Sequence, residues 1–139
     1  MWLQKSVKLQ AKPRGFHLVS DKILKALPEI STIHVGLLHL FLQHTSASLS
    51  INENADSSVR RDMESHFNQL APEDSPYYEY TYEGSDDMPA HIKSALLGCE
   101  MSLPIAQGSL KLGTWQGIYL GEHRDSASAR TLIATLTGE

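Results

Sequence analysis

The stretch Ile33–Asn54 constrains this chain most, because an apolar strand in it passes directly into a run of polar residues. The first half is rich in Leu and Phe, but it is too short and too often interrupted by histidines to span a bilayer. It therefore predicts a buried central strand. From His44 onward hydroxyl, amide and carboxyl groups follow, and polar groups at the end of a rigid strand commonly build a site. The alternative is that Thr45 and Ser46 only begin a turn.

Composition restricts the class of protein. At 139 residues the chain is long enough for one domain with an ordinary core. Its net charge of −4 and its dispersed Lys and Arg residues argue against nucleic acid as the main partner. Neither the apolar segment of a signal peptide nor a membrane span is recognisable, so no membrane partner is expected. Cys99 is the only cysteine, which excludes an internal disulfide and suits a cytoplasmic protein.

Alternation, helical periodicity and turn residues predict the order of the elements. They indicate two strands, a helix, two strands, two helices and three strands. The predicted strands cover residues 2–10, 16–19, 33–44, 47–51, 100–104, 110–123 and 129–137, with a brief strand at 78–82 inside a long loop. The predicted helices run over 22–27, from a cap at Asn54 or Asp56 to Pro72, and from Asp86 or Asp87 to Gly98. We expect one α+β domain over residues 1–139, a largely antiparallel sheet or sandwich with the helices packed on one side.

The second predicted helix carries an amphipathic pattern. Spacings of four, four and three residues mark its expected buried stripe, which consists of Val59, Met63, Phe67 and Leu70. Charged residues lie off this stripe and are predicted to form a solvated face: Arg60, Arg61, Asp62 and Glu64.

The long strand predicted near the C-terminus alternates glycine with large rings. A period of two places one set of residues on the same face: Gly113, Trp115, Gly117, Tyr119, Gly121 and His123. Glycine inside a strand weakens it, so three of them suggest a bulge, a bend or the close approach of a ligand or another backbone. The alternative, equally open, is that they relieve crowding in a tightly packed or intersubunit sheet.

Three histidines occur where predicted elements begin or end. His44 ends the central strand, His91 lies one helical turn after Asp87, and His123 ends the glycine-rich strand. We expect these three to converge on one pocket, with Arg124 or Trp115 at its edge. The other histidines are expected outside it: His17, His34, His39 and His66. Three imidazoles and a water are a known zinc arrangement, although the compact ligand spacings typical of zinc sites are absent.

Four blocks of the sequence together resemble the YjbQ family of small bacterial and archaeal proteins. The blocks are His44-Thr45-Ser46-Ala47-Ser48 with Asn52-Glu53-Asn54 and Asp56, Asp86-Asp87-Met88-Pro89-Ala90-His91-Ile92-Lys93, Gly113-Thr114-Trp115-Gln116-Gly117-Ile118, and Gly121-Glu122-His123-Arg124. The resemblance covers essentially the whole chain. It implies a compact α+β fold that assembles as a homotrimer. It also implies a weak, secondary thiamine-phosphate synthase activity, which joins a hydroxymethylpyrimidine diphosphate to a thiazole phosphate and releases pyrophosphate.

Residues of these blocks can be matched to that chemistry. Arg124 could clamp the departing pyrophosphate, and His91, near its helix start, could donate to it. Trp115 offers a flat surface for a pyrimidine ring. The remaining predicted substrate contacts are polar residues of the same blocks: Ser46, Asn52, Glu53, Asp56, Asp87 and Gln116.

A divalent metal is compatible with two sets of residues, and no organic cofactor is expected. Zn²⁺ would use His44, His91 and His123, whereas Mg²⁺ would use the carboxylates of Glu53, Asp56 and Asp87 with substrate oxygens. Two other functions stay open. The chain could be a trimeric metal- or small-molecule-binding protein, or a metal-dependent hydrolase that uses the three histidines.

Overall fold

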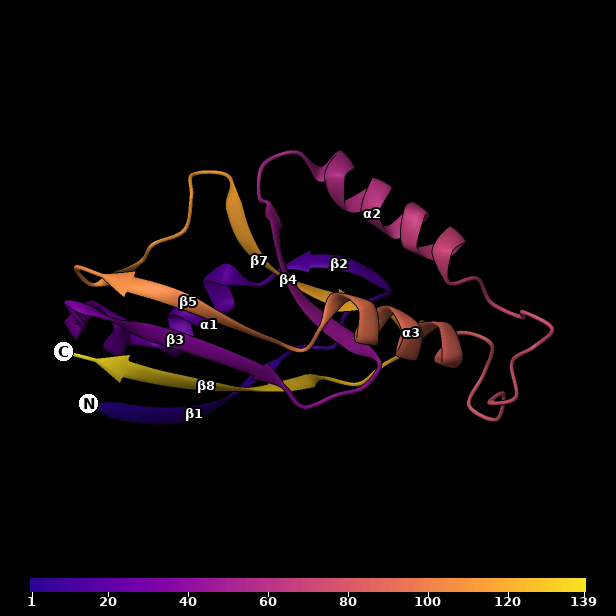
Figure 1. Cartoon of the computed structure of the whole chain (residues 1–139), viewed down its shortest axis with the longest axis horizontal. Helices are drawn as coiled ribbons and strands as arrows, with labels where there is room; N and C mark the ends of the chain where they lie inside the picture. The colour runs from indigo at the N-terminus through magenta and orange to yellow at the C-terminus, as the bar shows by residue number, and fades with distance from the viewer.

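Two antiparallel β-sheets share one hydrophobic core in the computed structural model, which describes all 139 residues (Figure 1). The larger sheet has the order β1-β8-β3-β5-β6 and the smaller β2-β7-β4. The strands are β1 (Trp2–Leu9), β2 (Gly15–Leu18), β3 (Val35–Leu42), β4 (Ala47–Glu53), β5 (Glu100–Ala106), β6 (Ser109–Leu110), β7 (Gln116–Glu122) and β8 (Arg130–Gly138). The helices are α1 (Ser20–Ala26), the 3₁₀ turn η1 (Pro28–Thr32), α2 (Ser57–Leu70) and α3 (Asp87–Leu97).

Alternating apolar residues of both sheets build the core. β3 lies between β8 and β5, which confirms the predicted central place of this strand, but it is buried on one face only, because Val35, Leu37 and Phe41 are exposed. Leu38 and Leu40 on β3 are fully buried, as is Leu120 on β7 of the smaller sheet. Helix α1 adds Ile23 to the same cluster. Burying each of these side chains stabilises the fold by roughly 1.5–3 kcal/mol.

Helices α2 and α3 cover the smaller sheet on the face away from this core. α2 packs on β2 and α3 on β4, and both lie beside the smaller sheet in Figure 1. Phe16 of β2 contacts Phe67 of α2 with ring centroids 6.0 Å apart. Ser94 of α3 donates a hydrogen bond of 2.7 Å to the carbonyl of Ala47 on β4. The predicted α+β class is thus confirmed. No helix combines the length and the hydrophobicity that a membrane span requires.

The first and last strands of the chain are neighbours. β1 and β8 pair from Trp2↔Thr137 to Leu9↔Arg130, and β8 lies between β1 and β3. The amino group of Met1 donates to the carbonyl of Gly138 at 3.2 Å, so both termini lie at one end of the larger sheet (Figure 1).

Two strand predictions are wrong. The loop between α2 and α3 contains no strand at 78–82, and the single strand predicted over 110–123 is broken into β6 and β7. The break has a local cause: the Gln116 amide donates to the Gly113 carbonyl at 3.1 Å, and the Gln116 side chain accepts from the Gly113 amide at 2.8 Å. This turn removes Gly113 and Trp115 from the face that they were predicted to share with His123.

Helix α2 begins as predicted but is buried less than predicted. Asp56 caps it by accepting a hydrogen bond of 2.9 Å from the Ser58 amide. No residue of the helix is fully buried, and Leu70 at its end is exposed. Arg60, predicted to lie in solvent, is instead partly covered and bonded to Tyr119 of β7. The helix therefore lies over the outer part of the smaller sheet and leaves its own apolar stripe partly open.

At Gly121 the structure supports the crowding explanation of the glycine-rich strand. A Cβ placed on Gly121 would clash with Ser48 Oγ and lie 2.8 Å from Cε1 of His123. Real Cβ contacts at such distances are essentially absent, so glycine is required here to make room for the buried His123 ring. Relief of crowding accounts for this glycine.

Replacing Gly121 by alanine is expected to destabilise the protein by about 1–3 kcal/mol, because the added methyl group overpacks the space beside His123. Gly113→Ala is the matched control, since that position is exposed and only the flexible Gln116 side chain lies near it. Urea unfolding of both variants measures the difference. Equal stability of the two variants would contradict the crowding explanation.

Candidate functional site

The start of α3 presents two aspartates to the end of β7. Pro89 fits in the first turn of the helix because its missing amide proton has no helical partner there. Asp86 occupies the N-cap position without capping the helix. Its carboxylate instead accepts two hydrogen bonds, one of 2.9 Å from Arg124 Nε and one of 2.8 Å from the Asp125 amide. Burial would raise the pKa of Asp86, but these two hydrogen bonds outweigh it and hold the pKa below its usual range.

Asp87, His91 and Arg124 form the candidate site. Asp87, which is nearly fully buried, lies 3.0 Å from Arg124 Nη1 and 3.5 Å from His91 Nε2 through its Oδ1 atom. His91 Nδ1 lies 2.9 Å from the carbonyl oxygen of Thr45. A carbonyl can only accept, so Nδ1 carries a proton and Nε2 is the ring atom that can exchange one. The helical spacing that predicted a shared face for Asp87 and His91 is therefore confirmed.

Tyr80 completes one side of this cluster, and sequence reasoning missed it. Its ring packs edge-on against His91 with centroids 5.5 Å apart. A hydrogen bond to Asp87, followed by burial and the charge of Asp87, raises the pKa of Tyr80 above its ordinary value of 10.0. Tyr80 therefore stays a neutral hydroxyl beside His91. Only its position in a loop with several tyrosines could have suggested a role.

Each of the three side-chain nitrogens of Arg124 has a partner in its own chain. Nε bonds Asp86, Nη1 pairs with Asp87, and Nη2 donates to the Glu83 carbonyl at 2.8 Å. A guanidinium has five N–H groups, so a clamp on a departing pyrophosphate would have to use the two that have no partner in the chain or exchange the others. In this structure Arg124 holds the two aspartates and the Glu83 loop in place.

His44 belongs to a neighbouring but separate arrangement. Its Nε2 accepts a hydrogen bond of 2.9 Å from the Thr131 amide, and Nδ1 lies 3.4 Å from Arg130 Nη1. Burial, followed by the charge of Arg130, lowers the pKa of His44, so the ring is neutral at neutral pH. Arg130 also donates a hydrogen bond of 3.2 Å to the carbonyl of Ser46. Ser46, predicted to contact substrate, is buried, and its carbonyl bonds Arg130.

His123 lies on the opposite face of β7 from its neighbour Glu122. It is only 1% exposed, shares a hydrogen bond of 2.8 Å with Ser48 Oγ through Nε2, and packs edge-on against Phe16. Its Nδ1 is buried without a partner. Burial, followed by the positive charges of Lys93, Arg130 and Arg14, lowers the pKa of His123 to about 3.

Buried Lys93 is a second group that sequence reasoning missed. It is 1% exposed, and its Nζ donates a hydrogen bond of 2.7 Å to Asn68 Oδ1 of α2. Burial is the largest cause that lowers its pKa. The signal was present in the sequence, because Lys93 falls on the same helical stripe as Pro89 and Ala90.

Five predicted contacts lie at the other end of the smaller sheet. In the β4–β7 ladder Ala47 pairs with Glu122 and Glu53 pairs with Gln116. Six residues of strand separate the two ends by about 20 Å, at roughly 3.3 Å per residue. The residues at the far end are Asn52, Glu53, Asp56, Trp115 and Gln116. Within one chain these residues therefore lie too far from His91 to contact the same small molecule.

The predicted metal sites are not formed within one chain. No group of three or more His, Cys, Asp or Glu side chains is arranged to hold a metal ion. For the zinc set the reason is that His44, His91 and His123 each bond to a different part of the backbone or to Ser48. For the magnesium set, Asp87 lies at one end of the smaller sheet and the two other carboxylates at the other.

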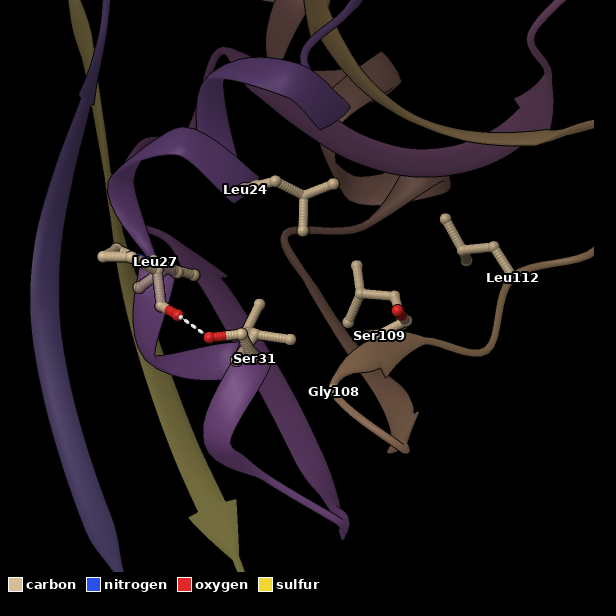
Figure 2. A pocket seen from close by; sticks show the side chains of 9 residues that line it. Leu24, Leu27, Ser31, Gly108, Ser109 and Leu112 are labelled. Carbon is tan, nitrogen blue, oxygen red and sulfur yellow. Dashed lines mark hydrogen bonds between the residues drawn. The ribbon is translucent and has the colours of Figure 1, made fainter.

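A hollow at the rim of the larger sheet offers no alternative active site. It has a volume of about 350 Å³ and lies between α1, η1 and the β5–β6 turn (Figure 2). Its lining is largely aliphatic, with Leu24, Leu27 and Leu112 among the side chains that point toward it. It holds no titratable side chain, so it provides neither an acid, a base nor a charge for chemistry.

The pKa of His123 predicts how stability depends on pH. The unfolded imidazole takes up a proton near pH 6.5, whereas the folded one resists it down to about pH 3. The unfolded state therefore binds more protons between these values, and stability falls as pH decreases through that window. From pH 7 to pH 5 this group accounts for a loss of about 2 kcal/mol in the free energy of unfolding.

Urea unfolding of His123→Gln at pH 7 and pH 5 measures this contribution. The variant should lose about 2 kcal/mol less stability than the wild type over that interval, whatever its stability at pH 7. His34→Gln is the control, because His34 is exposed. An unchanged pH dependence in His123→Gln would show that His123 is not the titrating group.

Known proteins similar to this chain match it along its whole length. The family model described as UPF0047 protein YjbQ-like matches residues 5–139. The UPF0047 protein YjbQ of Escherichia coli O157:H7 is 56% identical over 139 residues, covering 100% of both chains. The UPF0047 protein sll1880 of Synechocystis sp. is 43% identical over 136 residues, covering 98% of this chain and 92% of the relative. A solved structure of a yjbq/upf0047 family protein from Clostridium acetobutylicum has a TM-score of 0.83 at 33% identity, covering 96% of this chain and 99% of that one.

Proposed function

The chain belongs to the YjbQ-like UPF0047 family, and from this premise we propose that it is a cytoplasmic transferase of the thiamine-phosphate synthase type with low activity. The reaction joins a hydroxymethylpyrimidine diphosphate to a thiazole phosphate. The bond between the pyrimidine methylene carbon and the diphosphate oxygen breaks, the thiazole nitrogen bonds to that carbon, and pyrophosphate leaves with the bonding electrons.

The geometry of His91 is the observation that carries this proposal. Departure of pyrophosphate needs a proton or a positive charge at the leaving oxygen. His91 is partly exposed, its Nδ1 is held by the Thr45 carbonyl, and its Nε2 stays available beside Asp87. A proton on Nε2 would lie between Asp87 and an entering substrate. His91 therefore acts as the proton donor, and Asp87 keeps the ring oriented.

Arg124 and Tyr80 position this pair. Arg124 compensates the charges of Asp86 and Asp87, which would otherwise repel a diphosphate. Tyr80 packs against the imidazole, and the neighbouring Asp87 raises the pKa of its hydroxyl. The cluster supplies one proton donor and little free positive charge, which is consistent with a slow reaction.

Removal of the imidazole tests the proposal. Purified protein should form thiamine phosphate from the two substrates, and His91→Ala should lower the rate by about 10²-fold or more, as expected for loss of a general acid. His34→Ala is the matched control, since that histidine is exposed and does not belong to the cluster. Product formation is followed by chromatography, and thermal unfolding checks that both variants fold.

Either of two results would refute the assignment. A wild-type protein without thiamine-phosphate formation would exclude the synthase activity and leave a binding role for the cluster. A His91→Ala variant as active as His34→Ala would place the chemistry elsewhere.

We also propose that the protein is a homotrimer, and two features support this assembly. The outer face of the larger sheet exposes large apolar side chains, with Trp2 78% and Val35 60% exposed and Leu37 and Phe41 beside them. Such a face is unusual on an isolated monomer. In addition, the exposed Trp115 and the predicted substrate contacts beside it lie far from His91 in their own chain. A second subunit could bring these two sets of residues together into one site.

Light scattering at micromolar concentration should give about three times the protomer mass of 15.4 kDa. Leu37→Lys should shift the protein to smaller species, because it places a charge in the apolar face. Lys22→Glu on α1, an exposed site away from that face, should leave the mass unchanged. A wild-type mass of one protomer would refute the assembly.

A further inference from the structure

A second hollow, between the start of β2 and α2, is lined by arginines. It has a volume of about 400 Å³, within the range of small-molecule sites. The residues around it are Arg14, Gly15, Phe16, His17, Arg60, Arg61, Glu64 and Ser65. Three of the five arginines of the chain and one glutamate thus line this hollow. Its lining is therefore positively charged in a protein of net charge −4.

Two of these arginines have no acidic partner. Arg14 pairs with Glu73 at 3.1 Å, and less closely with Asp125 and Glu64. Neither Arg60 nor Arg61 makes an ion pair. Hydrogen bonds from Ser58, and then the charge of nearby Arg61, lower the pKa of Asp56, but no carboxylate pairs directly with either guanidinium group.

Arg60 is held in place without using its terminal nitrogens. Its Nε donates to Tyr119 Oη at 3.1 Å, and its guanidinium carbon lies 5.9 Å from the centre of the same ring. Tyr119 is itself anchored, because its hydroxyl donates to the carbonyl of Glu53. Both Nη atoms of Arg60 remain free of hydrogen bonds to protein. Arg61 uses one nitrogen, Nη1, on Ser57 Oγ at 3.0 Å.

From this geometry we infer that the arginine hollow is a binding site for the phosphate or diphosphate group of a small molecule. A guanidinium presents paired donors that match phosphate oxygens, and Arg60 and Arg61 can each supply such a pair. Phe16 provides an apolar floor. The site is separate from the His91 cluster and does not require the synthase activity.

The pattern of free donors favours a diphosphate over a single phosphate. Arg60 and Arg61 are successive residues with separate side chains, one anchored on the sheet and one exposed. A diphosphate can place one phosphoryl group on each guanidinium group. A single phosphate would have to bind both guanidinium groups by itself. We therefore expect inorganic pyrophosphate to bind more tightly than inorganic phosphate.

Calorimetric titration with inorganic pyrophosphate tests the inference. Arg60→Ala and Arg61→Ala should each weaken binding about tenfold or more, the usual effect of losing a hydrogen bond to a charged group. Lys22→Ala removes one exposed positive charge elsewhere and should change the affinity less than twofold. His34→Ala, at an exposed histidine outside both sites, should bind as the wild type does. If Arg60→Ala does not fold, Arg61→Ala decides, because Arg61 is exposed and its side chain makes a single hydrogen bond, to Ser57.

Three results would overturn the inference. No binding to the wild type would exclude the site. Loss of binding in His91→Ala with full binding in Arg61→Ala would place the anion at the His91 cluster, which would leave the synthase proposal intact. Equal affinity for sulfate or citrate at the same ionic strength would show a general anion surface rather than a phosphate site.

Discussion

The ion pair between Glu122 and Arg130 is the interaction on which the candidate site depends. Arg130 donates to Glu122 through Nε at 2.7 Å and Nη2 at 2.5 Å, and both side chains are buried. Two charges in the interior cost solvation, so they persist only with matched geometry, and loss of one partner typically costs 3–5 kcal/mol. The pair joins the end of β7 to the start of β8, one strand from each sheet.

Other parts of the site take their positions from this pair. Arg130 also reaches the carbonyl of Ser46 and lies beside His44, so it fixes the segment that leads into β4. Glu122 accepts from the Arg124 amide at 3.2 Å, which sets the direction of the chain after β7. Arg124 then meets Asp86 and Asp87. A buried pair between the sheets thus determines where the acidic start of α3 finds its cation.

Local signals in the sequence were sufficient for much of the fold. The cap at Asp56, Pro89 in a first turn and the helix end at Gly98 each depend on a few adjacent residues, and each could be predicted. The turn that separates β6 from β7 could not, because it depends on the Gln116 side chain folding back onto Gly113. Pairing between distant segments is what a sequence pattern leaves open.

The same distinction applies to the candidate site. The spacing of Asp87 and His91 was enough to place both on one helix face, and the structure agrees. The three histidines were recognisable because they lie where strands and helices begin or end. Their positions in the sequence did not show in which direction each ring points. His123 turns toward the helices, while the adjacent Glu122 turns toward the core side, so one residue of register separates two different environments.

The insertion of β8 between β1 and β3 has a consequence for biosynthesis. Because β8 is the only strand that pairs with β1, residues 2–9 have no strand partner until residues 130–138 have been made, so the pairing that completes this edge of the sheet is a long-range event.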